Sequence, residues 1–215
     1  MEEKIIETNY DVTKKSKLSK FYESNKILIF LTIFLLVICV SFVTYYSESK
    51  KKDKVEMSNN YISAKIYIQN DKKNEATKIL KSIILSNDKT YSTLSLFLIL
   101  NENLIDDKKE IINLFDHLLE NNKFEKEVKN LIIFKKIILQ SNYVDESELL
   151  QLIKPLITTD TLWKPHALLL LGDFFVFKKE YLKAKEFYLQ VLSLKDLNKE
   201  MYENAKLQLS LISNE

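Results

Sequence analysis

The sequence predicts an all-α protein in which one membrane-spanning helix precedes an array of helix hairpins. Two observations predict the helical class. The 215 residues include one glycine and two prolines, which leaves little for the tight turns and bulges that β-sheets need. Apolar residues also recur at spacings of three and four between short polar breaks, which is the pattern of amphipathic helices.

The charges are balanced and dispersed. All 32 basic residues are lysines, the acidic residues number 30, and the net charge is +2. Nucleic-acid binding usually needs a concentrated basic face and favours arginine, so we expect no nucleic-acid partner. The single cysteine, Cys39, cannot form an internal disulfide, so cysteine usage indicates no particular redox compartment.

The first element is an apolar run from Ile27 to Tyr46, ILIFLTIFLLVICVSFVTYY, which contains no charged residue. At about 1.5 Å per residue, this run spans roughly the 30 Å hydrocarbon core of a bilayer. A buried core helix and a cleaved signal peptide are the alternatives. The apolar part of a signal peptide is about 7–15 residues long and ends in small residues, whereas this run is longer and ends in two tyrosines. We therefore expect a retained transmembrane helix.

The span divides the chain into a tail over residues 1–26, the transmembrane helix 27–46, a charged linker 47–56 and a helical repeat domain 57–215. No Asp, Glu, Lys or His lies inside the span, so we expect a lipid-embedded anchor and no ion path. Lysines flank both ends, and the positive-inside count only slightly favours a cytoplasmic N-terminus. They are Lys14, Lys15, Lys17, Lys20 and Lys26 before the span, and Lys50, Lys51, Lys52 and Lys54 after it.

After the linker, about nine apolar-periodic segments predict helices in pairs. Asp107 with Glu110, and Asp145 with Glu148, place a capping acceptor three residues before a glutamate, as expected at a helix start. The predicted helices are Met57–Gln69 with Lys72–Leu85, Lys89–Asn101 with Asp107–Asn121, Phe124–Gln140 with Glu146–Ile157, Leu162–Phe177 with Lys179–Leu194, and a last helix Lys199–Ile212.

The most specific pattern lies near the C-terminus, at Leu171, Gly172, Phe175, Ala184 and Tyr188. A tetratricopeptide repeat (TPR) has large and small neighbours followed by an aromatic residue in its first helix, and a small residue followed by an aromatic one in its second. Gly172 stands where two helices must approach closely. A weaker copy, with the same twelve-residue step, lies at Ala64, Tyr67, Ala76, Leu80 and Ile83. The sequence therefore predicts a TPR-like solenoid, with an irregular helical bundle as the alternative.

The layout and several short stretches resemble the YfgM-like family, the ancillary subunits of the bacterial SecYEG translocon. The similar stretches are the lysine-rich tail, FYESNK (residues 21–26) before the span, a Tyr-x-x-Ala helix after the linker, and the C-terminal segment with Gly172, Asp173, Ala184 to Tyr188, Val191 and Leu192, followed by Ala205 to Leu207. The resemblance implies an inner-membrane protein with a cytoplasmic N-terminus. It also implies periplasmic repeats that contact translocon subunits and periplasmic chaperones.

No catalytic motif is apparent. His117 and His166 stand outside any metal-binding spacing, and we expect both to be surface or structural residues. One glycine excludes a P-loop and a dinucleotide fingerprint. We therefore expect no enzyme activity, cofactor, metal or small-molecule substrate. The aromatic stripe Phe174, Phe175, Phe177, Tyr181, Phe187 and Tyr188 is expected to be hairpin core.

The repeats predict a concave surface, lined mainly by the first helix of each pair, that binds segments of other proteins. Lys65, Glu102, Lys135 and Lys136 are the candidates on the exposed side. A cell-envelope or membrane-complex assembly scaffold with another partner is the alternative function. An enzyme would need a pocket that holds a histidine beside a perturbed acid.

Overall fold

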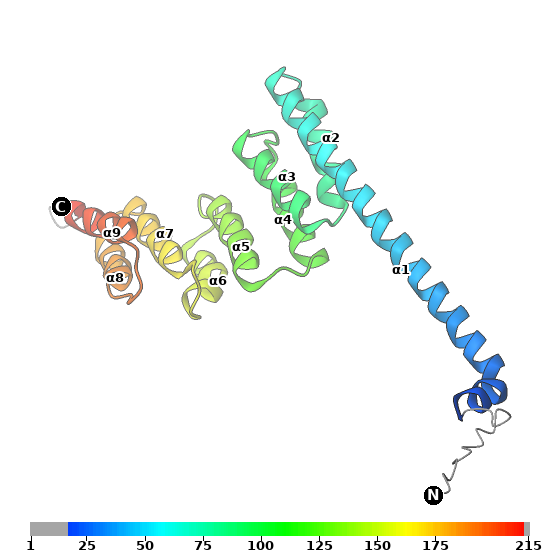
Figure 1. Ribbon diagram of the computed structural model, residues 1–215. Helices are drawn as coiled ribbons and strands as arrows, with labels where there is room; N and C mark the ends of the chain where they lie inside the picture. The colour runs from blue at the N-terminus through cyan, green and yellow to red at the C-terminus, as the bar shows by residue number, and fades with distance from the viewer. Residues whose placement is uncertain (1–16, 213–215) are drawn as a thin grey trace, which may run out of the picture. The chain divides into compact units, whose positions relative to one another are not determined.

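A computed structural model of the chain describes residues 17–212 (Figure 1). Within that range all regular structure is α-helical and there is no strand, which confirms the predicted helical class. The helices are α1 Lys17–Gln69, α2 Lys73–Leu85, α3 Lys89–Asn101, α4 Lys108–Asn121, α5 Lys126–Gln140, α6 Glu146–Ile157, α7 Lys164–Phe177, α8 Tyr181–Leu192 and α9 Lys199–Ile212. From α2 onward, each helix lies within two residues of its predicted bounds.

Helix α1 is longer than the sequence predicted. It begins at Lys17, inside the expected tail, and continues through residues 47–56 to Gln69, so the expected charged linker is helix and does not separate two helices. Residues 47–56 contain neither glycine nor proline and are rich in lysine and glutamate, which are good helix formers. Only Asn25 departs from helical geometry, with φ −119° and ψ 16°. The part of the tail over residues 1–16 lies outside the described residues.

Helix α1 contains a stretch long and apolar enough to cross a membrane. Its most apolar window of 18 residues has a mean hydropathy of 3.0, and none of that window is buried. Between Ile27 and Tyr46 every side chain except that of Ile29 is exposed. A helix that is apolar all round is normally buried in a protein core or in a bilayer, so this stretch is a candidate membrane anchor.

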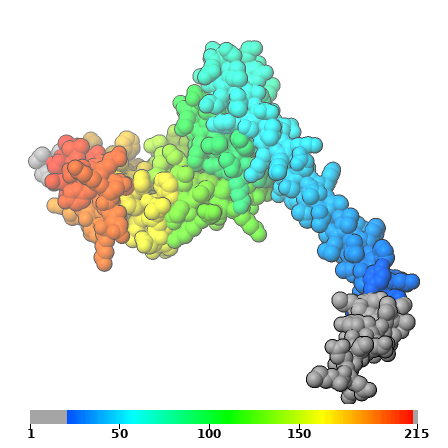
Figure 2. Space-filling model, viewed as in Figure 1, coloured from blue at the N-terminus to red at the C-terminus, as the bar shows by residue number. Residues whose placement is uncertain are grey.

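The chain divides after Glu56 into two compact units. In the second unit, residues 57–215, each helix from α2 to α8 packs against the next, α2 also packs against α4, and α7 also packs against α9. The space-filling view shows these segments in chain order (Figure 2). This unit positions the surfaces considered below.

Two buried clusters form the core of the helical unit. The N-terminal core takes its buried residues from the end of α1 and from α2, α3 and α4, together with Ile132 of α5. The C-terminal core takes Phe134 and Ile137 from the same helix and combines them with residues of α6, α7 and α8. A small cluster of Leu168, Val191 and Ala205 attaches α9. Helix α5 therefore belongs to both main cores.

Four helices end in the left-handed backbone conformation without using glycine. The residues with positive φ are Asp71 (57°), Asn87 (61°), Asn103 (48°) and Lys179 (62°). Asn and Asp adopt this conformation at lower cost than other residues that carry a Cβ. After three of them the next amide donates to the carbonyl five residues back, as in a Schellman cap: Lys72 to Tyr67, Leu104 to Ile99 and Glu180 to Phe175. A chain with one glycine thus still makes sharp helix-to-helix turns.

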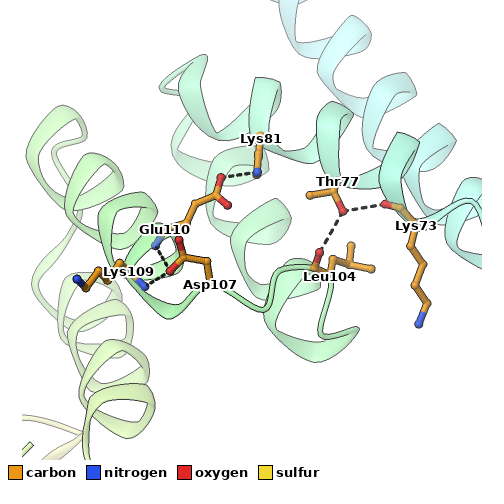
Figure 3. A network of polar contacts seen from close by, with 7 residues as sticks. All are labelled: Lys73, Thr77, Lys81, Leu104, Asp107, Lys109 and Glu110. Carbon is orange, nitrogen blue, oxygen red and sulfur yellow. Dashed lines mark hydrogen bonds and ion pairs between the residues drawn. The ribbon is translucent and has the colours of Figure 1, made fainter. Parts of the chain in front are cut away.

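A polar network joins α2 to the start of α4 (Figure 3). Lys81 of α2 forms an ion pair with Glu110 of α4. The Thr77 hydroxyl lies 2.7 Å from the carbonyl oxygen of Lys73 and 3.4 Å from that of Leu104. Asp107 caps α4 by accepting from the amide of Lys109 at 2.9 Å. The ion pair joins two helices that are not consecutive in the chain, and the Thr77 contact joins α2 to the segment before α4.

Candidate protein-interaction surface

Gly172 of α7 and Tyr188 of α8 are in close contact within the predicted repeat signature. An ideal Cβ on Gly172 would lie 2.3 Å from Cε1 of Tyr188 and 2.7 Å from its Cδ1, a distance that real Cβ atoms do not reach. The Tyr188 side chain is fully buried. Its hydroxyl donates to Oδ1 of Asp173 at 2.7 Å. Burial, followed by this hydrogen bond, raises the pKa of Tyr188 well above its usual value.

The other residues of the C-terminal signature lie in the same core. Leu171 and Ala184 are fully buried, and Phe175 is 1% exposed. The Phe175 and Phe187 rings stack with centroids 5.5 Å apart. The structure therefore brings together all five residues from Leu171 to Tyr188 between α7 and α8.

The N-terminal copy is also buried. Ala64, Ala76 and Leu80 are fully buried, Ile83 is 2% exposed, and Tyr67 packs against the same N-terminal core. The twelve-residue step thus joins two small buried residues in both halves of the domain. The helices pair differently in the two halves, however. In the C-terminal half the predicted pair α7 and α8 packs closely. In the N-terminal half α3 packs more closely against α2 than against α4, its predicted partner.

The first helices of two predicted pairs, α3 and α7, are apolar on nearly every side. Lys89 is the one charged residue of α3, and α7 has only Lys164 and Asp173. On α7, Phe177 is 82% exposed, which corrects its assignment to the hairpin core. The second helices α4 and α8 carry more charged residues. Exposed apolar side chains occur on both kinds of helix, since Leu182 of α8 is as exposed as Phe177.

Two hollows lie near the C-terminal end of α5, one between α3 and α5 and one between α7 and the turn that follows α5. The α3–α5 hollow measures about 250 Å³ and is lined by Phe97, Leu100, Asn101, Lys135, Ile138 and Leu139. The α5–α7 hollow measures about 350 Å³ and is lined by Ser141, Asn142, Val144, Leu170, Asp173, Phe174, Phe177 and Lys178. Both have mainly apolar walls with a lysine among the lining residues. Each could receive one or two apolar side chains of a partner segment.

A third and more polar cleft, of about 570 Å³, opens between the starts of α5 and α7 and the α8–α9 turn. Its lining residues are Glu127, Asp160, Thr161, Leu162, Lys164, Pro165, His166, Leu194, Lys195, Asp196, Leu197, Asn198 and Met201. Internal hydrogen bonds already occupy part of this polar lining. Glu127 accepts from the amide of Leu162 at 3.1 Å and, through its backbone carbonyl, from Nε1 of Trp163 at 2.9 Å. These bonds fix the turn that precedes α7.

The four charged residues predicted to lie on the exposed side of the repeats differ in their surroundings. Lys135 is exposed and lines the α3–α5 hollow. Lys136 is partly buried and forms an ion pair with Asp116 of α4, so it joins two helices. Lys65 and Glu102 are exposed but line neither hollow. Of the four, Lys135 is the one that lies beside an apolar hollow.

His117 makes a polar contact, whereas His166 packs among aromatic rings and its buried Nδ1 has no hydrogen-bond partner among the described residues. Nε2 of His117 lies 2.9 Å from Oδ1 of Asn87. The His166 ring lies against the Trp163 and Phe134 rings, with centroids 5.2 and 5.9 Å away. Among the described residues, no cluster of three or more His, Cys, Asp or Glu side chains could hold a metal ion.

Comparison with models of protein families, with curated proteins and with solved structures gave no match to this chain. The geometry of the hollows is therefore the direct guide to function.

Proposed function

We propose that this chain is a membrane-anchored scaffold that acts by binding other proteins, through the face formed by α3, α5 and α7. The observation that carries the proposal is the pair of apolar hollows beside the end of α5. Accessible apolar surface that is contiguous and edged by polar residues is typical of protein-interaction sites. The exposed Phe177 side chain adds an aromatic group of the kind enriched at such sites.

The helical unit is proposed to be a TPR-like solenoid. Support comes from the close contact of Gly172 with Tyr188 and from the burial of Ala64 and Ala76, which repeat the same twelve-residue step. In solenoids of this type, the first helices of successive pairs line one face and provide an extended binding surface. The α3–α5 hollow lies between two such first helices, and the α5–α7 hollow lies between α7 and the turn that follows α5.

The chemistry of the two hollows favours a segment that is apolar with acidic flanks. Lys135 lines one hollow and Lys178 lines the other, and neither pairs with a carboxylate in the described part of the chain. The one acid there, Asp173, accepts a hydrogen bond from Tyr188. A partner carboxylate near Lys135 would therefore gain attraction without competition from an acid in the lining of that hollow.

In its specific form, the proposal is an ancillary factor of the Sec translocon that links it to periplasmic chaperones. Support comes from the resemblance of the tail, the span and the C-terminal hairpin to the YfgM-like family. In this proposal the candidate span in α1 crosses the inner membrane, with the N-terminus in the cytoplasm and residues 57–215 in the periplasm, as the resemblance implies. Anchoring would raise the effective concentration of the domain toward membrane-bound partners without any tighter contact.

Site-specific photocrosslinking in cells tests the proposal. A photoreactive amino acid replaces Asn101 or Lys135, two exposed residues that line the α3–α5 hollow. The control position is Gln151, an exposed residue of α6 outside both hollows. Translocon or chaperone adducts from Asn101 and Lys135, absent from Gln151, are the expected result. Adducts with one other stable membrane complex would support the assembly-scaffold alternative. Equal adducts from all three positions would reject the hollow as the binding site.

A further inference from the structure

The end of α1 presents two opposite apolar faces. One face packs on the domain: Ala64 is fully buried, while Tyr61 and Ile68 contact the N-terminal core. The other face consists of Ile62 and Ile66, which are 52% and 51% exposed. At 3.6 residues per helical turn, the centres of these two faces lie on opposite sides of the helix. Nothing in the described part of the chain covers the second face.

The exposed face has the spacing of a coiled-coil seam. Val55, Asn59, Ile62 and Ile66 follow one another at intervals of four, three and four residues. This alternation places successive side chains at the a and d positions of a heptad. Val55 is 59% exposed, and Asn59 is exposed as well. Lys52, at the preceding a position, ends the apolar seam.

We propose that this face pairs with the same face of a second copy of the chain, as a short parallel two-stranded coiled coil. The choice of a second copy follows from Asn59, which stands at an a position. In a parallel, in-register pair, Asn59 would meet Asn59 of the partner subunit, so that each amide offers a donor and an acceptor to the other. An apolar helix of another protein would leave that amide unpaired in the seam.

The charges beside the seam fit the same arrangement. In a parallel pair, the g residue of one helix faces the e residue five positions later in the other. In this chain Lys51 occupies a g position and Glu56 the following e position, so two opposite-charge pairs form, one on each side. The next g and e positions are Ser58 and Ser63, which are uncharged and therefore add no repulsion between the two helices. Register and direction are thus both favoured.

A seam this short needs membrane anchoring to form a stable pair. Isolated helical pairings of fewer than about three heptads have too little buried apolar surface to associate tightly in water. Two copies anchored through α1 would share one orientation and be confined to the bilayer, which raises their effective concentration. The inference therefore rests on the proposed membrane anchor and is independent of partner binding at the hollows.

Cysteine crosslinking of the full chain tests the dimer. Cys39 is replaced by Ser, and single cysteines are placed by Ile62→Cys, Ile66→Cys and, as control, Lys54→Cys. Lys54 is an exposed residue of the same helix at a c position, away from the seam. A short, membrane-permeant bismaleimide is applied to whole cells. The expected result is a species with the mass of two chains for Ile62→Cys and Ile66→Cys, at several times the yield from Lys54→Cys.

Equal yields at all three positions, or no dimer at Ile62→Cys and Ile66→Cys, would overturn the proposal. A second variant adds Ile62→Glu to Ile66→Cys, which places two carboxylates face to face in the seam. It should reduce the dimer yield several-fold, while the far-ultraviolet circular dichroism of the purified chain stays unchanged because Ile62 is exposed. Fractionation of the same cells reports separately on the anchor, since an anchor that fails leaves the chain in the soluble fraction.

Discussion

The ring of Tyr188 occupies the space that a β-carbon on residue 172 would need, with only 2.3 Å between that position and Cε1. Gly172→Ala should therefore destabilise the domain. Displacing a fully buried ring costs about 1–3 kcal/mol, and the better helix propensity of alanine offsets up to about 1 kcal/mol of that. Urea unfolding of the full chain in detergent, followed by the fluorescence of the single tryptophan, Trp163, measures the change.

The matched control is the same substitution in a Tyr188→Ala background. Once the ring is gone, only the propensity gain remains, so Gly172→Ala should then raise the free energy of unfolding. If alanine at position 172 destabilises equally in both backgrounds, the ring is not the cause.

Tyr188→Phe should change how stability depends on pH. The folded chain holds the pKa of Tyr188 above its ordinary value because of burial and the bond to Asp173. The unfolded chain loses this proton near pH 10 while the folded chain keeps it. The contribution to stability is therefore complete below about pH 10 and declines as the pH rises further.

The phenylalanine variant lacks this titration, and we expect its urea midpoint to fall less than that of the wild type between pH 8 and pH 11. At pH 8 it should lose about 0.5–1.5 kcal/mol with the hydrogen bond. Parallel decline of both proteins would show that Tyr188 does not contribute to the alkaline sensitivity.

Asp88→Ala should destabilise the N-terminal half. The Asp88 carboxylate accepts from the amides of Thr90 and Tyr91 at 3.0 and 2.8 Å and so caps α3. Loss of such a cap costs about 0.5–2 kcal/mol. Glu125 occupies the same position before α5 without a side-chain bond, so Glu125→Ala is the control and should leave the urea midpoint within error. Similar losses from both would indicate a general effect of removing an acid.

Val37→Lys should weaken membrane insertion. Val37 lies at the middle of the apolar run of α1 and is 58% exposed, and a lysine at the centre of a span costs about 2.5–3.5 kcal/mol. After alkaline carbonate extraction, we expect the wild type in the membrane pellet and a large part of the variant in the supernatant. Ser49→Lys, beyond the run, should stay in the pellet. A Val37→Lys chain that stays fully in the pellet would contradict the assignment of this stretch as the anchor.

The sequence predicted the helices well because their ends carry local chemistry. Asp107 and Asp145 each cap a helix as expected, and apolar periodicity located the segments between the caps. Periodicity does not predict that residues 47–56 are helical, although this charged stretch contains no residue that breaks a helix and α1 runs through it. The boundary expected after Glu56 is where the chain divides into two units.

The candidate interaction surface is less predictable from the sequence. Lys135 and Lys136 are neighbours of the same type, yet one lines a hollow and the other pairs with Asp116. Phe177 continues the aromatic stripe of α7 but points to solvent, because α7 ends at this residue and no neighbouring helix covers it. Such differences depend on which helices pack together, and periodicity within one helix does not record that.

The sharing of α5 between the two cores has a further consequence. Ile132 and Phe134 both lie on α5, but each belongs to a different core. Unfolding of α5 would therefore remove packing from both halves, and we expect the domain to unfold in one cooperative transition. Phe134 also touches Trp163, with ring centroids 5.8 Å apart. Binding of a partner segment beside Lys135, as proposed, should therefore change the fluorescence of Trp163 by restricting the motion of α5.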